Sequence, residues 1–258
     1  MTSTESLKAF LIKKAAEYNQ PSFIKDDPIS IPHLFSKQQD IEIAGFFASI
    51  FAWGNRTTII NKTRELMELM DMAPHQFILD SSPQKLQQLT TFKHRTFNAT
   101  DLLYFLEFLH QHYHAHQSLE AAFLKGMNKK DETIEFGLRG FYDYFFSLED
   151  VPNRTRKHIA TPARGSTCKR LSMYLRWMVR RDNKGVDFGI WKKISPAQLI
   201  CPMDLHVARV AKKFDLLQRT QTDWLAAVEL TKWLRQLDPE DPARFDFALF
   251  GLGVMEKF

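Results

Sequence analysis

Apolar positions recur three and four residues apart along most of this chain, a spacing that lines up side chains on one face of an α-helix. Residues 5–18 form the first such segment, and Gln20–Pro21 ends it. The run from Gln38 to Trp53, QQDIEIAGFFASIFAW, is apolar nearly all round. It therefore predicts a central buried helix, which ends at Gly54–Asn55.

The same spacing predicts further helices over 56–70, 75–79, 98–115, 118–124, 133–146, 166–180, 204–214, 221–237 and 243–252. Two segments interrupt the pattern. Asp26–Phe35 carries Pro28 and Pro32 and is expected to be an extended connector. Residues 151–165 hold two prolines, a glycine and five basic residues, and are expected to form a loop.

The composition is typical of helices packed on helices. The chain has 258 residues, 44% of them hydrophobic, and its 10 glycines and 11 prolines are few beside 22 phenylalanines. Collagen, coiled coils and disordered tails are excluded, and an all-β sandwich is disfavoured. We therefore predict an all-α fold, built as one large domain or as two closely packed lobes.

The sequence does not indicate a membrane span, a secretion signal or a metal cluster. No stretch approaches the roughly 18 uninterrupted apolar residues of a membrane span, and the first residues lack the order of a signal peptide. We expect a cytoplasmic bacterial protein without a membrane partner, and association with the nucleoid is left open. Cys168 and Cys201 are too few for a four-thiolate zinc or iron–sulfur site, so we expect no metal cluster and no cofactor.

One stretch, His110-Gln-His112-Tyr-His114-Ala-His116, holds two pairs of histidines four residues apart. Such a pair can bind a metal ion from one helix face. No acidic ligand accompanies these histidines in the metalloprotease pattern, so we interpret them as a solvated cluster without a metal.

Positive charge is concentrated in one stretch of the chain. The net charge is +5, yet residues 151–193 hold twelve Lys or Arg against two Asp, so this stretch carries +10 and the remainder −5. Such a region is expected for a polyanion partner, because each neutralised phosphate releases a counterion. Nucleic acid is the expected partner, and solvated helix faces are the alternative interpretation.

Lys169 is the first candidate for chemistry. It falls in the first turn of a predicted helix, where the helix dipole and the neighbouring Arg164 and Arg170 disfavour its charged form. A neutral lysine amine can attack the C1′ atom of a nucleotide and form a Schiff base. A surface lysine on a DNA-binding helix would look the same in sequence.

Asp204 is the second candidate. Within PMDLHVARVAKKF it precedes an apolar-periodic run, so we expect it to cap a helix. An aspartate at a helix start can also stabilise the positive charge that develops on a sugar as its glycosidic bond breaks. The residues alone leave both roles open.

Three segments resemble the helix-hairpin-helix DNA glycosylases. Cys201–Ala211, CPMDLHVARVA, resembles their aspartate segment, and Gly165–Leu171, GSTCKRL, resembles the end of their hairpin. Ile43–Leu66 is similar to their early helix pair, and the order of the three segments agrees. The resemblance implies that Lys169 is a Schiff-base nucleophile and that Asp204 assists it.

The resemblance also implies a fold of two helical lobes with a cleft between them. One lobe would span 34–194, and the other would join 1–33 to 195–258. The family's Leu-Pro-Gly-x-Gly hairpin is absent, because Thr161-Pro-Ala-Arg-Gly165 stands in its place. Lys169 and Asp204 are 35 residues apart, a separation similar to that in the archaeal 8-oxoguanine glycosylase branch.

Over nearly its whole length the chain most resembles an uncharacterised bacterial family of unknown function. The resemblance rests on four motifs, which are RxRKHIxTP at 154–162, CKRLxMxLRWMVR at 168–180, GVDFGIW at 185–191 and FALFGLGV at 247–254. This match is specific, but it implies no activity.

A glycosylase extrudes its target base from the stack, which requires apolar walls for the base and cations for the backbone. The candidate base-pocket walls are Trp53, Phe188 and Trp191, and the alternative is that each is a core residue, as most tryptophans and phenylalanines are. The expected phosphate contacts are Arg154, Arg156, Lys157, Arg164, Arg170, Arg176 and Arg180. The expected partner is duplex DNA with a damaged base, bound by a monomer.

Three functions therefore remain open. The first is a DNA glycosylase, with or without lyase activity at abasic sites. The second is a non-catalytic nucleic-acid-binding protein that keeps a glycosylase-like fold. The third is an interaction protein that binds an acidic protein partner. Convergence of Lys169 and Asp204 beside an open pocket would favour the first.

Overall fold

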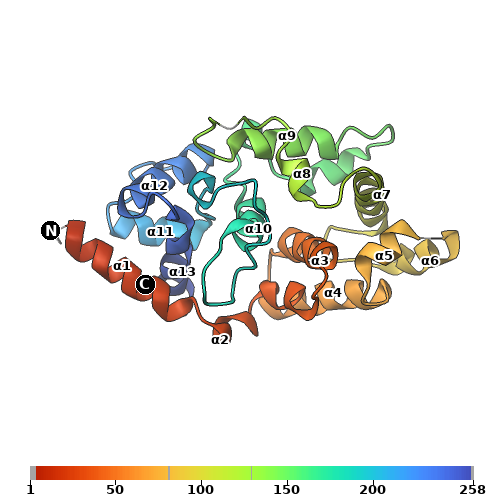
Figure 1. Ribbon diagram of the computed structural model, residues 1–258, viewed down its shortest axis with the longest axis horizontal. Coiled ribbons are helices and arrows are strands. Elements are labelled where there is room, and N and C mark those ends of the chain that lie inside the picture. Colours follow the sequence, from red (N-terminus) through yellow and green to blue (C-terminus); the bar gives the residue numbers. More distant parts are fainter. Residues whose placement is uncertain (1–3, 81, 129, 257–258) are drawn as a thin grey trace. The chain divides into compact units, whose positions relative to one another are not determined.

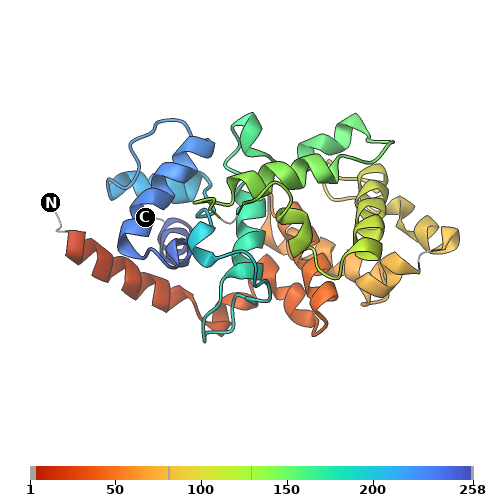
Figure 2. The same ribbon diagram turned by 45° about the horizontal axis from the view of Figure 1, so that its top comes forward.

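A computed structural model describes residues 4–80, 82–128 and 130–256, and Figures 1 and 2 show its ribbon. Within these residues the chain is helical and holds no strand, and one isolated bridge joins His94 to Phe97. The predicted all-α class is therefore confirmed. Among the helices of the described ranges, none combines the length and apolar character that crossing a bilayer requires.

The helices follow the predicted order. They are α1 (Thr4–Tyr18), α2 (Pro21–Ile24), α3 (Gln38–Phe51), α4 (Arg56–Leu69), α5 (Pro74–Leu79), α6 (Pro83–Gln88), α7 (Ala99–Ala115), α8 (Glu120–Phe123), α9 (Glu135–Phe145), α10 (Lys169–Val179), α11 (Leu205–Lys213), α12 (Trp224–Leu237) and α13 (Asp246–Phe250). Residues Gly251–Met255 continue α13 as a wider π-helical turn.

The structure corrects the expectation for residues 26–35 and adds two short helices, α2 and α6. The segment Asp26–Phe35 is not an extended connector, because it forms two 3₁₀ turns, Pro28–Ser30 and Pro32–Leu34. Proline fixes φ near the value that such turns need, so the two prolines start the turns. Helix α6 was not predicted, since its sequence lacks an apolar repeat.

The chain folds into two compact units. Unit 1 combines residues 4–25, 130–135 and 161–256, and unit 2 combines 26–128 and 136–160. These units differ from the predicted lobes mainly in the segment 161–194, which lies with the chain after residue 195; in addition, 26–33 belongs to unit 2 and 130–135 to unit 1. The physical reason for the main difference is a set of buried ion pairs that join Arg176 and Arg180 to Asp246 and Asp241.

Unit 2 is built on an aromatic core. Helix α3 carries Phe46, which stacks on Phe105 of α7 with ring centroids 5.6 Å apart. Helix α9 adds Phe141 and Phe145, and the ring of Phe141 lies parallel to that of Phe123 at 4.1 Å. Burying rings of this size removes a large apolar area from water, which drives the packing of these helices.

Unit 1 joins the two ends of the chain. Helix α1 packs along α13, and both ribbon views show these two segments side by side (Figures 1 and 2). Helix α10 is almost wholly buried within this unit, and Tyr174 on it meets the edge of Trp191 at 5.4 Å. The buried position of α10 fixes the direction of its first residue, Lys169.

A buried carboxylate holds the basic loop of unit 2 in place. Asp101 of α7 is fully buried and accepts a hydrogen bond from Thr155 at 2.8 Å and from the Asn98 backbone N–H at 3.0 Å. Its Oδ2 also lies 3.3 Å from His158 Nε2 and 3.2 Å from Arg154 Nη2. The sequence predicts an irregular loop here, whereas the structure shows that the loop contains the 3₁₀ helix Asn153–His158. The contacts of Asp101 hold this loop against α7.

We expect Asp101→Asn to lower the free energy of unfolding by about 2 kcal/mol. Burial alone would raise the pKa of Asp101, but the hydrogen bonds from His158, the Asn98 backbone and Thr155 lower it to about 2. Because the folded pKa lies below the unfolded value, this stabilisation is present above about pH 4 and is lost as pH falls towards 2. Urea unfolding at neutral and acidic pH measures it, with exposed Asp143→Asn as control. Equal loss in both variants would contradict the prediction.

Candidate active site

Lys169 is the first residue of α10, as the sequence predicts. The chain reaches it through Gly165 in the left-handed region at φ 71°, where glycine avoids a steric cost. The sequence predicts a helix from residue 166, but the helix begins at Lys169, and Cys168 occupies the cap position without a side-chain cap bond. Ser166 Oγ instead accepts from the Cys168 backbone N–H at 3.1 Å, which stabilises the tight turn before Lys169.

Asp204 caps α11, as expected. Its Oδ1 accepts hydrogen bonds from the backbone N–H groups of His206 at 2.9 Å and Val207 at 3.0 Å. These bonds use one carboxylate oxygen and fix the orientation of the whole group. The other oxygen, Oδ2, takes no part in these cap bonds and is available for a second contact.

That second contact is with Lys169. The Lys169 Nζ and Asp204 Oδ2 atoms are 3.5 Å apart, and each side chain keeps 26% of its surface exposed. Residues 35 positions apart in sequence are thus brought together at the starts of two helices of unit 1. An amine beside a partly exposed carboxylate can exchange a proton with it and can still be reached by a ligand.

Buried charges lie next along α10. Arg176 forms an ion pair with Asp246 of α13, and its Nε lies 3.3 Å from Asp187 Oδ1. Burial raises the pKa of Asp246 to about 6, although the Arg176 guanidinium and the Lys169 ammonium act in the opposite direction. The charge of Asp204 also raises the pKa of Asp246. Asp246 therefore interacts electrostatically with both members of the Lys169–Asp204 pair.

Two predicted phosphate contacts are not available for that role in this structure. Arg176 and Arg180 are 4% and 3% exposed. Arg180 lies 3.0 Å from Asp187, 2.8 Å from Asp182 and 2.9 Å from Asp241. Asp182 and Asp187 follow α10 closely in sequence, whereas Asp241 and Asp246, which also pair with these arginines, come from a distant segment.

The other predicted basic residues are more accessible. Arg154 and Lys157 are exposed, although Arg154 also donates to the Thr96 carbonyl at 2.8 Å. Arg156 is half-buried and its guanidinium lies 4.9 Å from the centre of the Phe146 ring. In unit 1, Arg164 is exposed before the Lys169 turn. Arg170 is half-exposed by surface area, and its partial burial lowers the pKa of its guanidinium.

The predicted base-pocket residues separate into different environments. Trp191 is 1% exposed and packs on Tyr174, so it is a core residue of unit 1 and not a wall of an open pocket. The segment before it folds back on α10, because the Phe188 backbone N–H donates to the Trp177 carbonyl at 2.8 Å. Phe188 is half-buried. Trp53 is half-buried in unit 2, with the Arg95 guanidinium 4.5 Å from its ring centre.

Residues 27–255 match the model of the DUF2400 family, whose description reads "Protein of unknown function". The chain belongs to the DUF2400 family. No curated protein and no solved structure matched the chain. Since the DUF2400 description names no activity, the function of this member has to be argued from its own side chains.

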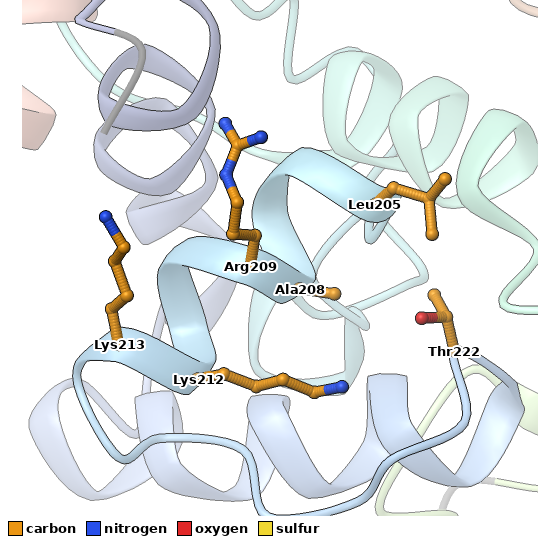
Figure 3. A pocket seen from close by; sticks show the side chains of 6 residues that line it. All are labelled: Leu205, Ala208, Arg209, Lys212, Lys213 and Thr222. Atoms are coloured by element: carbon orange, nitrogen blue, oxygen red, sulfur yellow. The ribbon is translucent and has the colours of Figure 1, made fainter.

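A hollow that sequence reasoning missed lies along α11 of this DUF2400 member. It encloses about 440 Å³ and is lined by Leu205, Ala208, Arg209, Lys212, Lys213 and Thr222. Figure 3 shows Leu205, Lys212 and Thr222 gathered around one part of it, whereas Arg209 and Lys213 extend from the other side of the helix turn. Three cations and no carboxylate line this hollow.

Leu205 links the hollow to the candidate site, because it directly follows Asp204 and is 75% exposed. Hydrogen bonds to backbone carbonyls hold two of the three cations in place. Lys212 Nζ donates to the Thr220 carbonyl at 3.0 Å, and Arg209 donates to the Gly253 carbonyl at 3.0 Å. The spacing of Arg209, Lys212 and Lys213 on one predicted helix could have revealed this basic surface, which lies beyond the stretch 151–193.

Neither cysteine of this chain is suited to act as a nucleophile at the site. Cys168 adjoins Lys169 but is 1% exposed, and burial raises the pKa of its thiol to about 12. Cys201 is fully buried, and burial raises the pKa of its thiol well above the ordinary range. Reactive cysteines are exposed and have a lowered pKa, so Lys169 is the better nucleophile candidate.

Proposed function

We propose that this protein is a DNA glycosylase that acts on a damaged base, with Lys169 as the nucleophile and Asp204 as its acid–base and electrostatic partner. The observation that carries the proposal is the 3.5 Å approach of Lys169 Nζ to Asp204 Oδ2 at a partly exposed position. The resemblance of both segments to the helix-hairpin-helix glycosylases supports it. The cleft between two lobes that this resemblance implies stays a prediction.

The chemistry requires the lysine amine in its neutral form, and Asp204 lies where it can accept a proton from Nζ. The Nζ lone pair then forms a bond to C1′ while the glycosidic bond breaks. The electron pair of the broken glycosidic bond leaves with the base, which takes up a proton. Nζ then loses a proton, and its lone pair expels O4′ from C1′; O4′ takes up a proton, and a protonated imine is left. During bond breaking, the Asp204 carboxylate stabilises positive charge on the sugar.

The hollow along α11 fits the backbone of a nucleic acid beside this site. Its three cations would contact phosphate oxygens, and the apolar Leu205 and Ala208 would contact sugar. Arg164 extends the exposed positive charge near the turn before Lys169. These residues replace the buried Arg176 and Arg180 as the proposed phosphate contacts of unit 1.

Borohydride trapping tests the proposal, because reduction converts the imine into a stable amine. Duplexes with an abasic site, 8-oxoguanine or uracil are compared with an undamaged duplex, and base release is measured in parallel. We expect a trapped complex with at least one damaged duplex and none with the undamaged one. Absence of trapping and of base release, with DNA binding that weakens steeply as salt rises, would overturn catalysis and favour a non-catalytic DNA-binding protein.

Two variants of Asp204 separate its chemical role from its cap. Asparagine retains a cap oxygen but no charge, so Asp204→Asn is expected to slow base release by about tenfold or more with little change in Tm. Asp204→Ala loses the cap as well and is expected to cost about 1 kcal/mol of stability. Equal activity of wild type and Asp204→Asn would contradict the assigned role.

A further inference from the structure

Helix α7 carries two pairs of histidines with the same spacing, and the structure gives them different environments. His110 pairs with His114, and His112 pairs with His116, each four residues apart. The ring centres are 4.3 Å apart in the first pair and 4.9 Å apart in the second. The sequence cannot distinguish the pairs, because their spacing is identical.

The second pair is unsuited to bind an ion. His112 is fully buried, and both of its ring nitrogens are engaged, Nδ1 with the Tyr144 hydroxyl at 3.2 Å and Nε2 with the Ser118 carbonyl at 3.0 Å. Burial lowers the pKa of His112 to about 4, so it is a neutral core residue. A metal could reach it only after these contacts were broken.

The first pair is open and its nitrogens converge. His114 is exposed and His110 is half-exposed on the outer side of α7. Their Nε2 atoms are 3.0 Å apart and share one hydrogen bond, which an ion bound between them would replace. Zinc–imidazole bonds are about 2.0–2.1 Å long, so two such bonds at an angle of about 90–110° place the nitrogens about 2.9–3.4 Å apart. The observed separation therefore matches two adjacent ligands of one ion.

We propose that His110 and His114 form a binding site for one divalent transition-metal ion, with water completing its coordination. Imidazole nitrogen favours copper, nickel and zinc over magnesium and calcium, which prefer oxygen. Glu107 lies one turn earlier on the same face and adds negative charge there. In the described ranges no group of three or more metal-ligating side chains gathers, which is why water supplies the remaining ligands.

This site does not depend on the proposed glycosylase activity, because α7 belongs to unit 2 and Lys169 to unit 1. Calorimetric titration of the untagged full chain with Cu²⁺, Ni²⁺, Zn²⁺ and Mg²⁺ tests it. We expect one ion per chain, the tightest binding for Cu²⁺ and none for Mg²⁺. His110→Ala and His114→Ala should each weaken binding at least about tenfold.

His116→Ala is the matched control, since it removes the histidine at the C-cap of the same helix and leaves the His110–His114 pair intact. Added Cu²⁺ should raise the Tm of the wild type but not that of the two pair variants. Binding that is absent, that persists in both pair variants, or that falls equally in His116→Ala would overturn the proposal.

Discussion

Replacing Lys169 with glutamine is expected to abolish the borohydride-trapped complex and to slow base release by at least about a hundredfold. Glutamine keeps much of the length of the side chain but has no amine to attack C1′. Its amide can still donate to Asp204, so the folded structure should be retained. The measurement compares trapping, base release and Tm of the variant with those of the wild type on the same damaged duplex.

Lys184→Gln is the matched control for this change. Lys184 lies in the same basic stretch and in unit 1, but it is exposed in a turn away from the start of α10. Both variants lose one positive charge, so a purely electrostatic role in DNA binding would affect them similarly. Full base release by Lys169→Gln would show that water is the nucleophile, or that another residue is, and would overturn the role given to Lys169.

Removing the Arg176 guanidinium by the substitution Arg176→Met is expected to lower the free energy of unfolding by about 3–5 kcal/mol. The variant leaves the buried carboxylate of Asp246 without its ion-pair partner and removes one of the two arginines beside Asp187. Methionine fills part of the volume, so lost packing contributes less than the uncompensated charge. Chemical unfolding monitored by circular dichroism measures the effect.

The exposed neighbour Arg181 provides the control, and Arg181→Met should change stability by less than about 0.5 kcal/mol. The double variant Arg176→Met/Asp246→Leu should recover part of the loss, since it also removes a buried carboxylate. If Arg176→Met instead kept full stability and reduced only DNA binding, Arg176 would be a phosphate contact after all.

The effect of Arg176→Met should depend on pH. The pKa of Asp246 is about 6 in the folded protein, above its ordinary value, because burial disfavours the charged form. The folded state therefore binds the proton more tightly than the unfolded state, and the contribution of Asp246 to stability falls as pH rises from about 4 to about 6. Without Arg176 the charged form is less favourable still, so the deficit should be largest at neutral pH and smaller near pH 4.

Much of the fold was accessible from local patterns. The predicted helices over 5–18, 56–70 and 98–115 agree within one or two residues with α1, α4 and α7, because apolar periodicity and end signals are local properties. Asp204 was expected at a helix cap and occupies one. The 3₁₀ turns in 26–35 were missed, because proline excludes regular helix interiors but permits these turns.

The roles of the charged residues were harder to predict from the sequence. Arg176 and Arg180 have the spacing of a solvent face, yet their partners Asp241 and Asp246 are more than sixty residues away in sequence. No local rule shows which carboxylate a long-range fold will bring to an arginine. Local sequence also leaves open whether Trp191 is a base-pocket wall or a core residue, because its packing partners depend on the long-range fold. Its burial against Tyr174 shows that it is a core residue.

By itself, the sequence determined the all-α class, the order of the helices and the positions of Lys169 and Asp204 at helix starts, because backbone periodicity and capping depend on neighbouring residues. Only the tertiary structure decided that these two side chains approach to 3.5 Å, that Arg176 and Arg180 are buried, and that His110 and His114 contact each other at an accessible position while His112 is buried. Each of these outcomes depends on which distant segments pack together, and therefore on the sum of many burial and pairing energies across the whole chain.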